Sequence, residues 1–440
     1  MGTDMTKGNL AKSLVLFTIP LVLSGLLQQL FNWVDGFIVG NVEGETALAG
    51  IGATTSLYYL FLTVMIGFTS GLSVLAAQQY GMGEEEKIRR TLSTFVVVLG
   101  GLFLLIAALG IPLTSWTLAL MDTPEAIFTL AKNYMQILFL GVPFMAVYNT
   151  YSAVLRGLGD SRASFLAVLV STGINVALDV LFVVVLRWGV EGAAAATVVS
   201  QAAMTVYLAL YAAERYQVLR FRIDREMIEG TILKRGLQFG LPPAIQAGVT
   251  SAGNLVLQRF MNGFGEQTVA AITTAYRVDS VLLLPIINFG SGIATVVGQN
   301  IGAGDQDRAK RTLKIGALLM AGISVCLTVL ILLTGEYLIA MFGLTAESVA
   351  VGKSFFYAIA GFYLVYGLAM AFRGYLEGLG DMTFSGAAGI FSLLVRIAAS
   401  YGLAGIFGTM IIAYAEAFSW AALLVLYLVR FYHKTRRRVE

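Results

Sequence analysis

The stretch from Gln28 to Gly40 reads QQLFNWVDGFIVG and places an ionisable side chain, Asp35, inside an apolar run. The run extends from Leu14 to Val39, which is long enough to cross a hydrocarbon core of roughly 30 Å at about 1.5 Å per residue. An acid inside such a segment costs about 2.5 to 3.5 kcal/mol on insertion scales. We therefore expect Asp35 to face protein, water or an ion.

Asp35 belongs to a polar stripe. Gln28, Asn32 and Asp35 stand at i, i+4 and i+7, so they share one face if the segment is a helix. A second acid lies in the run STGINVALDVLFVVV, where Asn175 and Asp179 share a face at i and i+4. Two separate apolar segments therefore each carry a carboxylate beside an amide.

Thr197 is predicted to lie at the depth of Asp179, because a tight connection, RWGVEG, joins their segments. Asp35 is also in the outer half of its segment, so Asp35, Asn175, Asp179 and Thr197 are predicted to converge. Two carboxylates in a low-dielectric pocket repel each other, so such a pair can take up and release a proton. The same oxygens also suit a hard cation such as Na⁺. A purely structural role, with hydrogen bonds to neighbouring helices and a protonated Asp35, is the alternative.

Composition fixes the class of protein. Of 440 residues, 58% are hydrophobic and only 12% charged, about half the charged share of a soluble domain. The single cysteine, Cys326, excludes an internal disulfide, and the single histidine, His433, lies in the basic tail. These counts argue against a Cys/His metal site, a Ser-His-Asp triad or a histidine proton relay. We expect no catalytic residues, no cofactor and no nucleic-acid partner.

The sequence predicts an all-α polytopic membrane protein with twelve transmembrane helices. The predicted spans are 13–40, 47–79, 92–120, 127–157, 161–186, 190–217, 231–264, 268–300, 312–342, 346–377, 382–402 and 407–432. Basic residues gather on alternate connections, which predicts that both termini are cytoplasmic. The most charged connection separates an N-terminal six-helix lobe (1–218) from a C-terminal lobe (236–440), with a cytoplasmic linker at 219–235.

The two halves repeat each other. QQYGMGEEEKIRRT at 78–91 matches QNIGAGDQDRAKRT at 299–312, and LRGLGD at 155–160 matches LEGLGD at 376–381. Both pairs are separated by 221 residues, so we infer a duplication of six spans in parallel orientation. Near the start of each half the offset is 222, which aligns Asn32 with Asn254 but Asp35 with Leu257. The glycine-rich GLGD segments are predicted to be helix–helix turns.

Two further sets of residues are candidates for function. Methionine and aromatic side chains suit an adaptable cavity, and the candidates for a substrate cavity are Gln28, Asn32, Tyr148, Tyr151, Thr250, Asn254, Tyr363 and Tyr366. Charged residues within the second half form a possible gate or ion-pair network, namely Arg277, Asp279, Arg373, Glu377, Arg396 and Glu416. Arg373 and Glu377 stand one turn apart, so we expect a local ion pair, with a cytoplasmic gate as the alternative. Arg396 and Glu416 lie on neighbouring antiparallel segments, which would allow them to pair.

The order of these motifs resembles the multidrug and toxic compound extrusion (MATE) family over nearly the whole chain. The resemblance rests on the early IPLVLSGLLQQLFNWVDGFIVG, the paired RGLGD and EGLGD turns, and NVALD followed by GVEGAAAAT. It implies two lobes that open alternately and ion-coupling residues at Asp35, Asn175, Asp179 and Thr197. Another branch of the family carries acids in spans 7 and 10, but here those places hold Thr250 and Tyr366.

The resemblance implies a secondary active transporter in a prokaryotic cytoplasmic (inner) membrane. It would exchange H⁺ or Na⁺ for organic cations and other amphiphilic drugs, and we expect a monomer in contact with the lipid bilayer. A lipid-intermediate flippase of the same superfamily is the alternative, since Arg277, Arg373 and Arg396 would suit a pyrophosphate. A channel or membrane-embedded enzyme is a further alternative, but no catalytic base and nucleophile can be identified.

Overall fold

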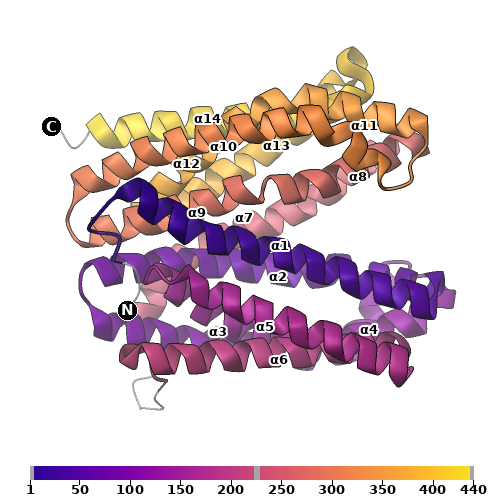
Figure 1. Cartoon of the computed structure of the whole chain (residues 1–440), viewed down its shortest axis with the longest axis horizontal. Helices are drawn as coiled ribbons and strands as arrows, with labels where there is room; N and C mark the ends of the chain where they lie inside the picture. The colour runs from indigo at the N-terminus through magenta and orange to yellow at the C-terminus, as the bar shows by residue number, and fades with distance from the viewer. Residues whose placement is uncertain (1–3, 222–227, 437–440) are drawn as a thin grey trace. The chain divides into compact units, whose positions relative to one another are not determined.

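The computed structural model describes residues 4–221 and 228–436, and every regular element within them is a helix (Figure 1). Long helices follow from the apolar composition, because inside a bilayer each backbone N–H and C=O must find its partner within the protein. Connections between consecutive helices are short. The described residues therefore form long helices joined by short connections.

The first half contains six long helices. They are α1 (Leu10–Glu43), α2 (Glu45–Gly81), α3 (Glu85–Leu120), α4 (Glu125–Gly157), α5 (Ser161–Asp179) and α6 (Gly189–Arg215). A π-helix, η1 (Val180–Val185), continues α5, and a 3₁₀ turn, η2 (Gln217–Leu219), follows α6. The π-helix is a feature that apolar periodicity alone does not predict.

The second half has the same order, with some spans broken in two. Its helices are α7 (Gly230–Asn262), α8 (Glu266–Leu282), α9 (Leu284–Gly302), α10 (Gln306–Ala340), α11 (Ala346–Ile359), α12 (Tyr363–Gly378), α13 (Met382–Phe407) and α14 (Ile411–Arg436). Short 3₁₀ turns lie between α11 and α12 (η3, Ala360–Phe362) and between α13 and α14 (η4, Gly408–Met410). The α8–α9 break precedes Pro285, which cannot donate a backbone hydrogen bond.

Length and hydropathy identify ten candidate membrane spans among the described residues. One of them, Met382–Arg436, contains both α13 and α14, which meet at η4. The helix α7 has 33 residues but is not among the ten, since glutamines and Asn254 interrupt its apolar run. With α7 included and Met382–Arg436 divided, each predicted span corresponds to one helix or one broken helix. The all-α polytopic fold is confirmed.

The chain divides into two compact units. The first consists of Ile19–Leu237 together with Asp4, and the second of Met5–Thr18 and the chain from Gln238 onward. The second unit thus includes the start of α1, which lies inside the predicted N-terminal lobe. Of the predicted linker 219–235, residues 222–227 lie outside the described residues, and α7 already begins at Gly230.

Contacts near the N-terminus explain why Met5–Thr18 belongs to the second unit. The Met5 N–H donates to Gln299 Oε1 at 3.0 Å, and the Asn300 amide donates to the Met5 carbonyl at 3.3 Å. Arg308 Nη2 donates to the Gly8 carbonyl at 2.9 Å. The segment before α1 is therefore fixed to α9 and α10 by hydrogen bonds.

The duplicated turns have the same backbone conformation in both halves. Gly159 has φ 81° and Gly380, 221 residues later, has φ 85°. Residues that carry a side chain rarely adopt this left-handed backbone conformation, so glycine is favoured at both places. The GLGD segments are therefore helix–helix turns, as predicted.

Close approach of α4 to α2 depends on a glycine at the end of α4. A Cβ atom added at Gly157 would lie 2.6 Å from Ala76 Cβ, 2.7 Å from the Ser73 carbonyl oxygen and 2.9 Å from the Ala77 nitrogen. Two of these neighbours are backbone atoms, which cannot turn aside. Small residues at such crossings let helices pack in a membrane.

We expect Gly157→Ala to lower the melting temperature of the purified protein, because overpacking costs about 1–3 kcal/mol. The matched control is Gly173→Ala on α5, where an added Cβ meets nothing within 4 Å. That control should keep or raise the melting temperature, since alanine favours helix over glycine. Equal effects of the two substitutions on thermal unfolding in detergent would contradict the packing argument.

Candidate ion-coupling site

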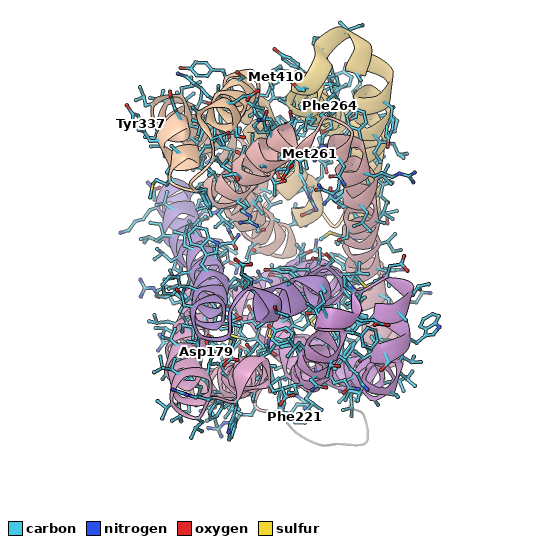
Figure 2. All side chains as sticks on the ribbon, turned by 90° about the vertical axis from the view of Figure 1, so that its right-hand side faces the viewer. Asp179, Phe221, Met261, Phe264, Tyr337 and Met410 are labelled. Atoms are coloured by element: carbon cyan, nitrogen blue, oxygen red, sulfur yellow. The ribbon has the colours of Figure 1, made fainter. Side chains whose placement is uncertain are left out.

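The four predicted ion-coupling residues are all buried in the first unit. Asp35 on α1 is 8% exposed, Asn175 and Asp179 on α5 are fully buried, and Thr197 on α6 is 5% exposed. Figure 2 marks Asp179 among the helices of this unit. Burial of two acids and an amide inside apolar helices is unusual, since polar groups in such positions normally require partners.

The polar atoms of this cluster lack those partners. Six of them form no hydrogen bond with any described residue, namely Asp35 Oδ1, both Asn175 amide atoms, both Asp179 carboxylate oxygens and Thr197 Oγ1. Each unsatisfied buried polar group costs about 1–3 kcal/mol. A structural role in bonding neighbouring helices does not account for side chains that bond to none of them. The atoms are instead free to bind something small.

The local backbone changes at the acid itself. The α-helix α5 ends at Asp179, and the π-helix η1 begins at the next residue, Val180. A π-helix inserts an extra residue into the turn and alters the direction of side chains, and such segments occur often at functional sites. The chain then reverses through Arg187 and Gly189, both with positive φ, into α6. This reversal returns Thr197 beside the helix that carries Asp179.

The negative charge of Asp35 acts electrostatically on the carboxylate of Asp179. Among the described residues, neither acid takes part in an ion pair. Val39 and Val183, each four residues after one of the acids, belong with Ala193 on α6 to one buried hydrophobic cluster. The result is a low-dielectric site with two carboxylates and no cation, which favours uptake of positive charge.

Three tyrosines near the cluster were missed by sequence reasoning. Tyr134 on α4 is buried and lies within electrostatic reach of both Asp35 and Asp179. Tyr58 on α2 accepts a hydrogen bond from Gln201 Nε2 at 2.8 Å, and Tyr59 accepts one from Asn32 Nδ2 at 2.8 Å. The adjacent tyrosines in an apolar span were an available signal. Nothing in the spacing of Tyr134 distinguished it from other aromatic residues.

The other members of the first-half candidate set differ from the buried cluster in their exposure or in their neighbours. Gln28 and Asn32 are exposed on α1, although they share a stripe with Asp35. Tyr148 and Tyr151 are each 5% exposed and belong to a hydrophobic core. A role of these four residues in a substrate cavity stays a prediction.

The charged residues of the second half form the two expected ion pairs. Arg373 Nε lies 2.7 Å from Glu377 Oε1, and Arg396 Nη2 lies 2.9 Å from Glu416 Oε2. A role of either pair in gating stays a prediction.

The remaining candidates of the second half differ in how closely they contact one another. Buried Asp279 accepts a hydrogen bond from the Tyr363 hydroxyl and lies within electrostatic reach of Arg396 and Glu416. Tyr363 and Tyr366 both contact the ring of Trp420, and Tyr366 stacks on it with ring centroids 4.7 Å apart. Arg277 is exposed, and Thr250 is partly buried on α7. A shared role of these residues in a gate or an ion-pair network stays a prediction.

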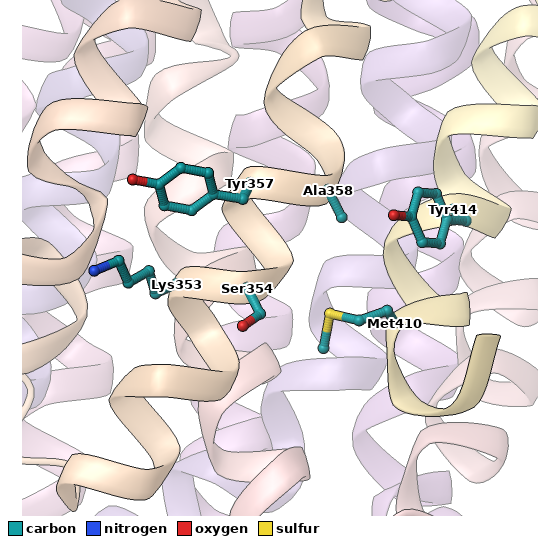
Figure 3. A pocket seen from close by; sticks show the side chains of 6 residues that line it. All are labelled: Lys353, Ser354, Tyr357, Ala358, Met410 and Tyr414. Atoms are coloured by element: carbon teal, nitrogen blue, oxygen red, sulfur yellow. The ribbon is translucent and has the colours of Figure 1, made fainter.

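Two cavities lie within the second unit. A surface pocket of about 330 Å³ is bounded by Tyr357 and Ser354 on α11, by Met410 at the end of η4 and by Tyr414 at the start of α14 (Figure 3). Lys353 also lines it and pairs with Glu336 at 2.6 Å. A second cavity of about 340 Å³ includes Asn254 in its wall.

Within the described residues, no group of three or more His, Cys, Asp or Glu side chains could hold a metal ion. The donor set of Asp35, Asn175, Asp179 and Thr197 has two carboxylates and two neutral oxygens, which suits a proton or a weakly held alkali cation. These are ions that a transporter exchanges.

We expect Asp179→Leu to raise the melting temperature of the purified protein, because it removes two unpartnered buried oxygens. The gain should correspond to about 1–3 kcal/mol. Asp160→Ala is the contrasting control, since Asp160 accepts bonds from Tyr216 Oη at 2.7 Å and Tyr211 Oη at 3.1 Å and caps α5. It should lower the melting temperature. A fall of similar size in both variants would show that Asp179 is a structural residue.

Comparison with known proteins identifies relatives along nearly the whole chain. The sequence profile of the MatE family matches residues 20–181 and again 242–402, once in each half. The chain is 31% identical over 381 residues to the Bacillus subtilis "Probable multidrug resistance protein YpnP", covering 86% of this chain and 85% of that protein. It is 28% identical over 450 residues to B. subtilis "Probable multidrug resistance protein YoeA", covering 98% and 96% of the two chains.

Solved structures share the fold. A crystal structure of MATE in the straight conformation matches with a TM-score of 0.91 and 21% identity over all of both chains. An outward-facing multidrug resistance MATE family transporter of the MOP superfamily matches with a TM-score of 0.88 and 22% identity over 99% of this chain and 97% of that one. Together with the twofold profile match and the paired six-span halves, these findings show that the chain belongs to the MatE family.

Proposed function

We propose that this protein is a secondary active multidrug efflux transporter that exchanges H⁺ or Na⁺ for organic cations and other amphiphilic compounds. The observation that carries the proposal is the set of six unpartnered polar atoms around Asp35 and Asp179 in a member of the MatE family. The names of the B. subtilis relatives, both probable multidrug resistance proteins, support the same activity. Alternating access of its two units would carry the exchange.

Each residue of the cluster has a distinct part in this proposal. Asp35 and Asp179 provide the negative charge that binds the ion, and burial strengthens their mutual repulsion when both are ionised. Asn175 and Thr197 supply neutral oxygens that hold a bound cation or its water. Binding of one positive charge removes the repulsion, and this change in local energy would favour one arrangement of the surrounding helices over another.

The membrane potential and the pH gradient supply enough free energy to drive such an exchange. One elementary charge moving down about 100 mV supplies roughly 2.3 kcal/mol, and one pH unit supplies about 1.4 kcal/mol. One ion per cycle therefore supports a gradient of about a few hundredfold for an uncharged compound. Exchange of one H⁺ for one monovalent organic cation moves no net charge, so one pH unit supports a gradient of about tenfold for such a cation. ATP binding to this chain is unnecessary.

The lipid-intermediate flippase is the weaker candidate. Its argument needs free basic residues to hold a pyrophosphate, but Arg373 and Arg396 are each paired with a glutamate. Arg277 is exposed and stands on a different helix from both. Two neutralised arginines offer a polyprenyl pyrophosphate little net positive charge.

We expect Asp35→Asn and Asp179→Asn each to abolish gradient-driven ethidium efflux from energised proteoliposomes, because neither amide can take up and release the coupling charge. Glu125→Gln, at an exposed acid in the first turn of α4, is the matched control and should transport at the wild-type rate. Wild-type efflux by Asp35→Asn would refute the proposal. Absence of transport in the wild type under any gradient would favour the flippase instead.

A second experiment separates the two coupling ions. Proteoliposomes receive either a pH gradient or a Na⁺ gradient, and the efflux of wild type is compared with that of Thr197→Ala. If Na⁺ is the ion, the loss of a neutral oxygen should raise the half-saturating Na⁺ concentration by about tenfold, which is the effect of 1.4 kcal/mol. If H⁺ is the ion, Na⁺ should have no effect on either protein, and transport should follow the pH gradient.

A further inference from the structure

The second unit contains a cavity of about 340 Å³ that the proposed ion exchange does not use. Its polar wall consists of Asn254 and Gln258 on α7, Tyr276 on α8, Arg396 and Ser400 on α13, and Glu416 on α14. Apolar side chains of α7 complete it, among them Met261, which Figure 2 marks. A volume of this size and a wall of few polar groups on an apolar surface are typical of small-molecule sites.

Hydrogen bonds repeated in both units show what this cavity corresponds to. In the first unit Ser171 Oγ donates to the Ser200 carbonyl at 3.1 Å, and Ser200 Oγ donates to the Thr197 carbonyl at 2.8 Å. In the second unit Ser392 Oγ donates to the Ser419 carbonyl at 2.9 Å. Ser419 Oγ in turn donates to the Glu416 carbonyl at 2.7 Å. Glu416 therefore occupies the place of Thr197.

The same register relates the other residues. Asn175 and Asp179 follow Ser171 by four and eight positions, and Arg396 and Ser400 follow Ser392 by four and eight. On the first helix of each half, the sequence repeat sets Asn254 against Asn32 and Leu257 against Asp35. All five of these second-unit residues line the cavity: Asn254, Leu257, Arg396, Ser400 and Glu416. The cavity is the internal counterpart of the ion-coupling cluster.

The chemistry at the two corresponding places differs. The first unit has two acids without a base, whereas the second has one base and one acid in contact. Arg396 Nη2 donates to Glu416 Oε2 at 2.9 Å and to Tyr276 Oη at 2.8 Å. Among the described residues, Nε and Nη1 of Arg396 have no acceptor. The guanidinium therefore keeps donors for a ligand in the cavity.

We propose that this cavity binds a small zwitterionic amphiphile. Its anionic group would accept from the free edge of Arg396, its cationic group would lie against Glu416, and its apolar body would contact the side chains of Leu257 and Met261. An anion alone would meet the field of Glu416, and a cation alone would meet that of Arg396. Only a ligand that carries both charges complements both partners, since arginine binds carboxylates through directed bonds.

The test compares three probes that each contain an indole ring but differ in charge: L-tryptophan, tryptamine and indole-3-propionate. Equilibrium dialysis of radiolabelled probes against the purified full-length protein in detergent gives each dissociation constant. L-Tryptophan should bind at least about tenfold more tightly than either singly charged probe, because each of those loses one charged contact. Equal binding of all three, or no saturable binding of L-tryptophan, would overturn the proposal.

Variants locate the binding within the protein. Arg396→Gln and Glu416→Gln should each weaken L-tryptophan binding at least about tenfold, but either could unfold the unit by leaving its buried partner unpaired. Leu257→Trp fills the cavity and keeps the ion pair, so it should abolish binding without loss of thermal stability. Lys353→Gln, in the separate surface pocket, should bind as the wild type does. Unchanged binding by Leu257→Trp would place the ligand elsewhere and refute the proposal.

These measurements are independent of ion exchange. Binding is read at equilibrium without a gradient, so a failure of ethidium efflux in the wild type leaves the result unaffected. Conversely, if the wild type exports ethidium but does not bind L-tryptophan, the proposed transport function stands and the proposed second site is refuted.

Discussion

The structure depends on one constraint: a polar group buried in a bilayer-spanning bundle destabilises the fold unless it forms a hydrogen bond. Many of the described hydroxyl side chains form such a bond by donating to a backbone carbonyl one turn earlier, as Thr69, Thr114 and Ser251 do. The atoms around Asp35 and Asp179 do not. Of the 14 buried side-chain atoms without a partner among the described residues, six belong to this one cluster, whereas the other eight are spread over eight residues. Under the proposed ion exchange, stability and transport make opposite demands on these side chains.

Much of the architecture could be predicted from the sequence because membrane helices leave strong signals. Apolar length gave the spans, and the constant 221-residue offset gave the duplication and both glycine turns. The ion pairs of Arg373 with Glu377 and of Arg396 with Glu416 followed from helical spacing and from the antiparallel order of two neighbours. Burial of Asp35, Asn175, Asp179 and Thr197 was also expected, since the depths of these residues can be counted from the turns.

Other features could not be predicted, each for a physical reason. The π-helix after Asp179 changes one hydrogen bond in a valine-rich run whose composition is the same either way. The second unit includes Met5–Thr18 because backbone groups near the N-terminus bond to Gln299 and Asn300, and such bonds leave no mark in hydropathy. Tyr134 approaches the acids through the packing of α4. The cavity beside Arg396 became recognisable only once two serine bonds fixed the register between the halves.

The paired serine bonds have a consequence for how this protein came to differ between its halves. They hold α5 to α6 and α13 to α14 in the same way, so the ancestral frame survived duplication in both descendants. Frame and pocket therefore depend on different side chains: serines bond the helices to each other, whereas Asn175 and Arg396 supply the chemistry of the two pockets. One half now carries a pair of acids at this place, and the other carries a base bonded to an acid. One repeated frame can thus hold pockets of opposite chemistry.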